Sequence, residues 1–296
     1  MNNTPPNINF SKIEPLNYSK LNLLNNKIYI KRDDLIHPII SGNKWRKLKY
    51  NIEYCFQYGY EGIVTFGGAY SNHLIATAEA CRLYKLKSIA FVRGEELSPF
   101  SNVLLQECHK KGMDLRFISR TTYKEKKRSL YFEKYLRKFL SLPEGGAGFL
   151  GIKGCMEILN KEDGFFDWVV LSQGTTTTSI GVLLSLPVQT KLLVVPALKG
   201  FNAISEMKEQ MKKSNYASKY IDFKMQQVRV ASEYHFGGYS KTTTELLSFR
   251  KEFLKESEIN IDKVYNSKAL FALKEILKKE KWKNQKILYI HTGGYE

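Results

Sequence analysis

Short apolar strands alternate with helices along this chain, and this alternation restricts its fold more than any other feature of the sequence. Between the strands, apolar residues recur at helical spacing, as do Trp45, Leu48, Ile52 and Cys55. Repeated strand–helix units predict an α/β protein with mostly parallel sheets and helices on both faces, in three layers. The segments that we expect to form strands are residues 28–31, 62–66, 87–92, 115–119, 168–171, 192–195, 228–231 and 287–290.

Two segments interrupt the alternation. A long basic helix is predicted over residues 123–140, and the Pro- and Gly-rich segment 143–148 follows it. We interpret that segment as a domain boundary. The predicted division is a large domain formed by residues 1–46 and 159–296 and a small α/β domain formed by residues 47–158.

Composition excludes several classes of protein. A chain of 296 residues with 43% hydrophobic and 25% charged residues can bury a large core. Its four cysteines are too few for a disulfide scaffold and lack Cys-x-x-Cys spacing, so no metal site is expected. We find no signal peptide and no run of roughly 18 apolar residues, so we expect a soluble, cytoplasmic protein without membrane partners.

The net charge of +17 raises the question of a polyanionic partner. Only 10 of the 46 basic residues are arginine, and the lysines are scattered over predicted helix faces. We therefore do not expect nucleic-acid binding. A positive field would also attract small anions such as a phosphate or a carboxylate.

The first candidate site is the segment 41–48, Ser-Gly-Asn-Lys-Trp-Arg-Lys-Leu. Lys44 stands at a predicted helix start, where a neighbouring cation and the helix dipole both lower a lysine pKa. A lowered pKa yields the neutral amine that a Schiff base requires. Lys47 lies one turn further on the same face and could neutralise a phosphate. The alternative is a solvated basic helix.

The second candidate follows the strand at residues 62–66 and contains Gly-Gly-Ala-Tyr-Ser-Asn-His at 67–73. Free backbone N–H groups at such a helix start can bind a carboxylate or a phosphate. Ser71 is also a good N-cap residue, so a structural role competes. His73 taken alone would be a core or supporting residue.

The third candidate, Ser-Gln-Gly-Thr-Thr-Thr-Thr-Ser at 172–179, again lies between a strand and a helix. Its hydroxyl groups and helix N–H groups suit a phosphate, although they could also only cap the helix. Further candidates are Tyr239 and Tyr265, whose hydroxyls could act as acid or base near a cofactor. Thr292 follows the last strand and could contact a ligand ring.

Taken together, these motifs resemble the pyridoxal-phosphate enzymes of the tryptophan synthase β-like group, fold type II. The branch that they resemble contains 1-aminocyclopropane-1-carboxylate (ACC) deaminase and D-cysteine desulfhydrase. Ser-Gly-Asn-Lys-x-Arg-Lys-Leu and Gly-Gly-x-x-Ser-Asn-His carry the resemblance, which extends from Lys-Arg-Asp-Asp-Leu at 31–35 to the final Gly-Gly. The resemblance implies two αβα domains, pyridoxal 5'-phosphate as cofactor and a homodimer.

The resemblance also implies roles for individual residues. Lys44 would be the Schiff-base lysine, and Ser71 would bind the substrate carboxylate and relay a proton. Tyr239 and Tyr265 would be the two active-site tyrosines. The cofactor would contact Lys47, Asn72, Gly174, Thr175, Thr176, Thr177, Thr178, Asn266 and Thr292, and the substrate Ser71, Asn72 and His73.

Two positions distinguish the branches within this resemblance. The deaminase pattern has Tyr-Glu-Gly where this chain has Tyr265-Asn266-Ser267, and His-Leu-Gly-Gly where it has His291-Thr292-Gly293-Gly294. Thr292 favours the desulfhydrase, because a neutral residue at the pyridine nitrogen makes the ring a weaker electron sink. The expected reaction is α,β-elimination from a D-amino acid. ACC deamination and a non-catalytic, metabolite-binding relative are the alternatives.

Two departures from the family pattern affect this interpretation. Related phosphate loops read Gly-Thr-Gly-Gly-Thr, whereas residues 174–178 read Gly-Thr-Thr-Thr-Thr. A threonine forced to a positive φ would cost about 1–3 kcal/mol, and one in helical conformation would cost little. Asn266 is neither the glutamate of the deaminase nor a hydroxyl residue, so it leaves the substrate open.

Overall fold

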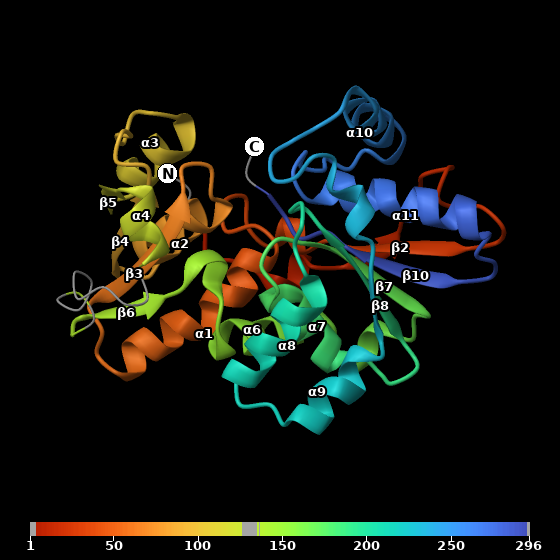
Figure 1. Ribbon diagram of the computed structural model, residues 1–296, viewed down its shortest axis with the longest axis horizontal. Coiled ribbons are helices and arrows are strands. Elements are labelled where there is room, and N and C mark those ends of the chain that lie inside the picture. The colour runs from red at the N-terminus through yellow and green to blue at the C-terminus, as the bar shows by residue number, and fades with distance from the viewer. Residues whose placement is uncertain (1–3, 126–134, 136, 295–296) are drawn as a thin grey trace.

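The computed structural model describes residues 4–125, 135 and 137–294, and it contains two sheets that lie side by side (Figure 1). The larger sheet is parallel except for its antiparallel edge strand β1, and the smaller sheet is parallel throughout. In spatial order, the larger sheet consists of β1 (Ile13–Pro15), β2 (Lys27–Lys31), β10 (Lys286–Ile290), β7 (Trp168–Gln173), β8 (Lys191–Pro196) and β9 (Val228–Val230), and the smaller sheet of β5 (Met113–Ile118), β4 (Lys87–Arg93), β3 (Gly62–Gly68) and β6 (Phe139–Leu142).

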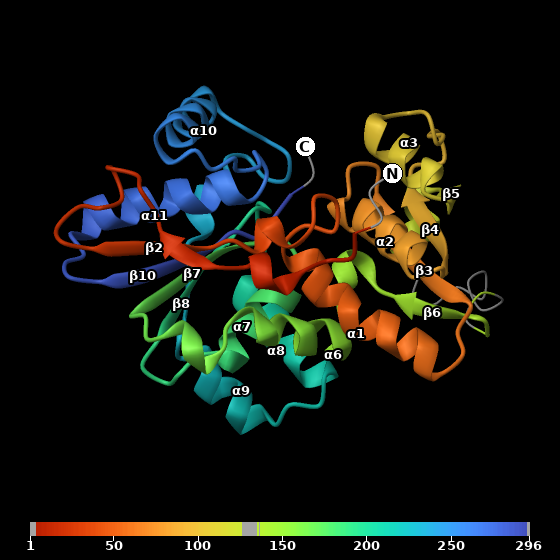
Figure 2. The same ribbon diagram turned by 180° about the vertical axis from the view of Figure 1, so that it is seen from behind.

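Helices cover both faces of the larger sheet (Figures 1 and 2). One face packs against α10 (Thr244–Ser257) and α11 (Asn266–Glu280), and the opposite face packs against α6 (Phe149–Cys155), α7 (Thr177–Ser185), α8 (Ala203–Lys213) and α9 (Ser218–Met225). Successive residues of a strand point to opposite faces, so Ile287 and Tyr289 enter one core and Leu288 and Ile290 the other. Because both faces are buried, β10 carries no charged residue after its first position, Lys286.

The smaller sheet is covered in the same way. On one face lie α1 (Asn43–Gln57), α2 (Asn72–Leu83) and α3 (Val103–Lys110). On the other face, Tyr123 of α4 (Arg120–Lys124) packs with aromatic residues of β3 and β4. The predicted fold class, two three-layer αβα units with mostly parallel sheets, is therefore confirmed.

The smaller sheet also corrects one prediction. The helix expected over residues 123–140 is wrong at both ends, because α4 stops at Lys124 and residues 139–140 belong to β6. Residues 126–134 and 136 of that helix lie outside the described residues. β6 pairs in parallel with β3, with Phe139 beside Gly62. This contact spans far more sequence than a local pattern can reveal, so the tertiary pairing overrides the helical pattern.

The chain leaves the larger sheet after β2, builds the smaller sheet and then returns through α6. All four strands of the smaller sheet fall within the predicted small domain, 47–158, and all six strands of the larger sheet fall outside it. The boundary positions themselves, one of which lies inside α1, stay a prediction. No helix in the described part of the chain is long and apolar enough to cross a membrane. All four cysteines are buried and unpaired.

A buried ion pair fixes the start of α1 between the two sheets. Arg46 donates two hydrogen bonds to Asp33, each 3.1 Å long, and the Asp33 side chain is fully buried. The Ser11 hydroxyl also donates to Asp33. Two of the sequence motifs, at 31–35 and 41–48, thus meet in one structural contact that orients the helix carrying Lys44.

Candidate active site

Lys44 occupies the first turn of α1, and its amine is held by its neighbour in the sequence. The Lys44 Nζ donates to Asn43 Oδ1 at 2.6 Å, and Asn43 Nδ2 donates to Thr178 Oγ1 at 2.9 Å. The bond to Thr178 fixes which end of the Asn43 amide faces the lysine. Burial, and next the charge of Lys47, lower the pKa of Lys44 to about 7. The expected direction is confirmed, but desolvation is the main cause, rather than the helix dipole.

The turn before Lys44 packs backbone against backbone on the end of β10. Gly42 has φ +60°, and a Cβ atom there would lie 2.1 Å from the carbonyl oxygen of Thr292. The Asn43 N–H donates to the same carbonyl at 3.2 Å. Only glycine permits both this conformation and this approach. Gly42 therefore brings Lys44 and Thr292 together from opposite ends of the sequence.

Lys47 points at the threonine-rich loop. Its Nζ donates to the Thr175 Oγ1 at 3.0 Å and to the carbonyl of Gly145 at 2.9 Å. The Lys47 side chain is buried and forms no ion pair within the described residues, and burial lowers its pKa. A buried cation with only neutral acceptors is a costly arrangement that a bound anion would relieve. The first turn of α7 adds N–H groups without partners in the helix. This cluster fits a phosphate dianion.

The threonines of this loop adopt conformations that threonine tolerates. Thr176 has φ −78° and ψ −10°, and α7 begins at Thr177. None of Thr175–178 is among the residues at positive φ. The strain that replacing glycine could have introduced is therefore absent from these residues, and the cost is the small one expected for helical threonine.

The turn after β3 carries three polar side chains, Ser71, Asn72 and His73. Ser71 is the N-cap of α2, but its hydroxyl makes no capping hydrogen bond. His73 is buried, and its Nε2 lies 2.8 Å from the Thr65 hydroxyl, which itself donates to the Leu142 carbonyl. His73 Nε2 is therefore the donor, and Nδ1 is left without a partner among the described atoms. Asn72, like Ser71, is only partly buried.

The electrostatic surroundings keep His73 neutral. Burial, and then the charges of Lys47 and Lys44, lower its pKa to about 3. A Cβ atom on Gly146 would lie 3.5 Å from His73 Cε1, so the imidazole borders the Gly145–Gly146 turn. His73 thus lies beside the lysine cluster, and its expected contact with substrate stays a prediction.

The two tyrosines meet across the loop that contains Gly174. The Tyr239 and Tyr265 rings are 6.1 Å apart in an edge-to-face arrangement. A Cβ on Gly174 would lie 2.8 Å from the Tyr265 ring, so a larger residue would displace that ring. The Tyr239 hydroxyl donates to the carbonyl of Tyr70 at 3.5 Å, next to Ser71. Burial raises the pKa of both phenols, so both are protonated at neutral pH.

Asn266 holds the end of β10 and has no hydrogen-bonding group to spare. Its Nδ2 donates to Asp262 and to the carbonyl of Gly293, the latter at 2.9 Å. Its Oδ1 accepts from the Tyr289 hydroxyl at 2.7 Å and from the Thr292 N–H at 3.2 Å. Asn266 is fully buried and holds the Thr292 N–H, and its expected contact with a cofactor stays a prediction.

Three residues that border these groups were given no role of their own from the sequence, although Ser172 begins the third candidate segment. Ser172 lies with its hydroxyl 3.1 Å from that of Thr292. Asp262 accepts hydrogen bonds from three consecutive backbone N–H groups, 264–266, at the start of α11. Gly145 belongs to the segment interpreted as a domain boundary. The Gly-Gly sequence at 145–146 could have revealed Gly145, and an aspartate shortly before a helix start could have revealed Asp262.

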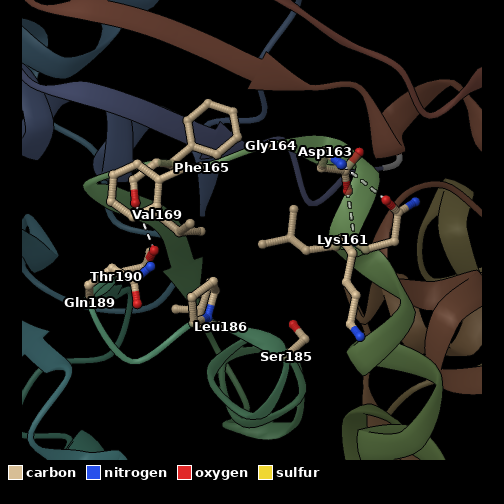
Figure 3. Close-up of a pocket in the computed structure, with 13 residues that line it drawn as sticks. Lys161, Asp163, Gly164, Phe165, Val169, Ser185, Leu186, Gln189 and Thr190 are labelled. Atoms are coloured by element: carbon tan, nitrogen blue, oxygen red, sulfur yellow. Dashed lines mark hydrogen bonds between the residues drawn. The ribbon is translucent and has the colours of Figure 1, made fainter.

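Contacts therefore bring Lys44, Lys47, the threonine-rich loop, the two tyrosines and Thr292 into one region at the carboxyl ends of β3, β7 and β10, next to the turn that contains Ser71, Asn72 and His73. A separate pocket of about 490 Å³ lies at the opposite, amino ends of β7 and β8 (Figure 3). Its lining combines apolar residues such as Phe165, Phe166 and Leu186 with polar ones, and it contains none of the predicted site residues. No group of three potential metal-binding side chains occurs in the described part of the chain.

Known proteins resemble this chain over nearly its whole length. The profile of the family described as "Pyridoxal-phosphate dependent enzyme" matches residues 11–293. A Pyrococcus horikoshii protein, whose name provisionally assigns it as a 1-aminocyclopropane-1-carboxylate deaminase, is 30% identical over 281 residues, covering 90% of this chain and 84% of its own. The mitochondrial bifunctional D-cysteine desulfhydrase/1-aminocyclopropane-1-carboxylate deaminase of Arabidopsis thaliana is 29% identical over 314 residues, covering 90% and 72%.

The structural comparison agrees with the sequence comparison. The crystal structure of an ACC deaminase homologue superposes with a TM-score of 0.78 at 25% identity, covering 96% of this chain and 89% of that one. A hydrogen sulfide-producing enzyme from Fusobacterium nucleatum shares the fold with a TM-score of 0.69 at 16% identity, covering 97% and 94%. These matches, together with a partly buried lysine of lowered pKa near the Lys47 cluster, show that this chain belongs to the pyridoxal-phosphate dependent enzymes of fold type II.

Proposed function

We propose that this enzyme is a lyase of the D-cysteine desulfhydrase type, which eliminates the β-substituent of a D-amino acid. With D-cysteine and water, the products would be pyruvate, ammonia and hydrogen sulfide. The observation that carries the proposal is the pair of neutral hydroxyls formed by Ser172, near the end of β7, and Thr292, just after β10. The plant relative that carries both activities in its name supports this class of reaction.

Different residues would hold three parts of the cofactor: its aldehyde carbon, its phosphate and its ring hydroxyl. Lys44 would bind its aldehyde carbon, Lys47 and the 174–178 loop its phosphate, and Asn72 its ring hydroxyl. When bound, pyridoxal phosphate supplies an aldehyde that condenses with amines and a ring that accepts electrons. Lys44 suits this role because a pKa of about 7 leaves a substantial neutral fraction at physiological pH.

The protein side chains would perform the binding and proton-transfer steps. The free hydroxyl of Ser71 and the first N–H groups of α2 would bind the substrate carboxylate. The Lys44 amine, assisted by Ser71 or Tyr265, would take the proton from the α-carbon. A protonated phenol, Tyr239 or Tyr265, could then donate a proton to the departing thiolate, because burial keeps both phenols protonated.

The surroundings of Thr292 favour elimination over opening of a cyclopropane ring. Asn266 brings no charge, and its donors are already used by Asp262 and Gly293. A pyridine nitrogen beside Thr292 would therefore meet a hydroxyl rather than a carboxylate. A ring without that carboxylate is a weaker electron sink, which suffices for a good leaving group such as thiolate. ACC deamination remains the second candidate because the archaeal relative bears that name.

An assay of the purified enzyme, loaded with pyridoxal phosphate, distinguishes these functions. The substrates are D-cysteine, L-cysteine, β-chloro-D-alanine and ACC. We expect sulfide and pyruvate from D-cysteine, and none with Lys44→Ala. Formation of 2-oxobutyrate from ACC without sulfide from D-cysteine would support the second candidate. Cofactor binding without turnover of any of these compounds would favour a non-catalytic relative and contradict our proposal.

We also propose, from the family resemblance, that the enzyme is a cytoplasmic homodimer with the small domain at residues 47–158. Light scattering after size-exclusion chromatography would give its mass. A mass near that of one 34.2 kDa chain at assay concentrations would contradict the dimer.

A further inference from the structure

A buried lysine lies behind the two tyrosines and contacts neither cofactor nor substrate in the proposed function. Lys268 is on α11, less than one turn after Tyr265, and its side chain has no solvent exposure. Its Nζ donates to the carbonyl of His235 at 2.9 Å and to that of Gly238 at 2.7 Å. Burial lowers its pKa to about 8, with the charge of Asp262 acting in the opposite direction. Removing the Lys268 ammonium from water costs free energy, which indicates that its two hydrogen bonds serve a structural role.

The loop that Lys268 contacts has a backbone that needs support. After the short helix Ser232–His235, positive φ angles occur at Phe236 (51°), Gly237 (87°), Gly238 (113°) and Ser240 (58°). Non-glycine residues in that region cost energy and persist only where surrounding structure imposes them. The two carbonyls that converge on the ammonium come from both ends of this turn. The Lys268 ammonium therefore links the two ends of the His235–Gly238 turn through hydrogen bonds to both carbonyls.

Tyr239 is the next residue after Gly238, and its position depends on that turn. Its side chain is 41% exposed, so packing alone does not immobilise it. Its ring stands edge-to-face with Tyr265, and its hydroxyl reaches the Tyr70 carbonyl at 3.5 Å. Tyr265 immediately precedes α11, the helix that contains Lys268. One helix thus carries one tyrosine and secures the loop that carries the other.

We propose that Lys268 is a positioning residue that holds the 235–240 loop, so that the Tyr239 phenol faces Tyr265 and the turn that contains Ser71. The inference about geometry needs only the contacts described above. Its consequence for catalysis rests on the proposed function, in which Tyr239 faces the substrate.

Hydrogen exchange followed by mass spectrometry tests the geometric claim without any activity. In Lys268→Met, amides of residues 234–241 should exchange at least about tenfold faster than in the wild type, while other segments keep their rates. Lys278→Met, an exposed position on the same helix, is the matched control and should leave this loop unchanged. Unchanged exchange of the loop in a folded Lys268→Met protein would overturn the proposal.

A double-mutant cycle tests the consequence for catalysis. If Lys268 acts through Tyr239, kcat/KM for D-cysteine should fall to a similar level in Lys268→Met, Tyr239→Phe and the double variant, which should be within about threefold of the single variants. If the double variant instead lost activity by the product of the two single losses, Lys268 would act independently of Tyr239, which contradicts our inference.

If Lys268→Met does not fold, the exchange experiment uses Lys268→Arg and Lys268→Gln. Because Lys268→Arg keeps the charge and the hydrogen-bond donors, its loop amides should exchange more slowly than those of Lys268→Gln. Equal exchange in these two variants would also refute the claim. An enzyme inactive on D-cysteine would refute the proposed function and leave the exchange result valid.

Discussion

The lowered pKa of Lys44 leads to a quantitative prediction about its reactivity. An amine with a pKa of about 7 is about half neutral at pH 7, whereas one at the ordinary value of 10.5 is neutral in roughly 0.03% of molecules. The neutral form of Lys44 should thus be enriched about a thousandfold. Because the protonated form dominates below the pKa, reactivity should rise with pH and level off above about pH 8. The charge of Lys47 contributes, so Lys47→Met should move this rise to higher pH.

The assay is trace labelling of the cofactor-free protein with acetic anhydride between pH 5 and 11, with peptide mass spectrometry of the Lys44 peptide. Added N-acetyl-lysine in each sample reports an ordinary amine. The quantity compared is the midpoint, the pH at which labelling of Lys44 reaches half of its maximum. Lys49→Met is the matched control on the same helix, since Lys49 pairs with Glu157 and its loss should not move the Lys44 midpoint. The midpoint is the readout, because the intrinsic nucleophilicity of an amine also changes with its pKa.

A Lys44 midpoint close to that of N-acetyl-lysine would refute the argument from burial. An equal shift in Lys47→Met and Lys49→Met would show that Lys47 has no particular influence. The first result would remove the physical basis for assigning Lys44 as the reactive amine, whereas the second would leave burial as the main cause of its lowered pKa.

Three further substitutions test other parts of the structure. Arg46→Met strands the buried Asp33 carboxylate and should cost about 3–5 kcal/mol in urea unfolding, whereas Arg120→Met, at an exposed pair, should cost less than about 1 kcal/mol. Asn266→Asp places two carboxylates in contact and should lower the free energy of unfolding by at least about 2 kcal/mol, and an unchanged value would contradict the described network. Gly174→Ala displaces the adjacent tyrosine ring and should lower kcat/KM about 100-fold, with wild-type circular dichroism excluding misfolding.

Local sequence patterns were sufficient for most of the fold. Eight strands were predicted close to their observed positions, because a strand buried on both faces is an uninterrupted apolar run. The same reasoning failed for β6, whose partner β3 is distant in the sequence. It also missed the antiparallel edge strand β1, which is three residues long and only partly buried. Short edge strands carry too little pattern to be recognised.

The motifs indicated the candidate site in a similar way. Lys44, Ser71 and the threonine loop were recognisable because glycine and hydroxyl residues at strand–helix junctions have few other uses. The sequence could not show that Asn266 turns its amide toward Asp262, or that Ser71 makes no capping hydrogen bond although it stands at an N-cap. Both outcomes depend on which partner is nearest in space.

The sequence by itself therefore determined the class of fold and the chemical type of the site, since periodicity and junction residues act over a few neighbouring positions. Only the tertiary structure decided the electrostatics and the supporting contacts. The burial that makes Lys44 a weak base, the pairing of Lys47 with Thr175 and the contact of Lys268 with the 235–238 loop all join residues far apart in the chain. Desolvation and hydrogen bonding act through space, and their strength depends on distances that no local pattern encodes.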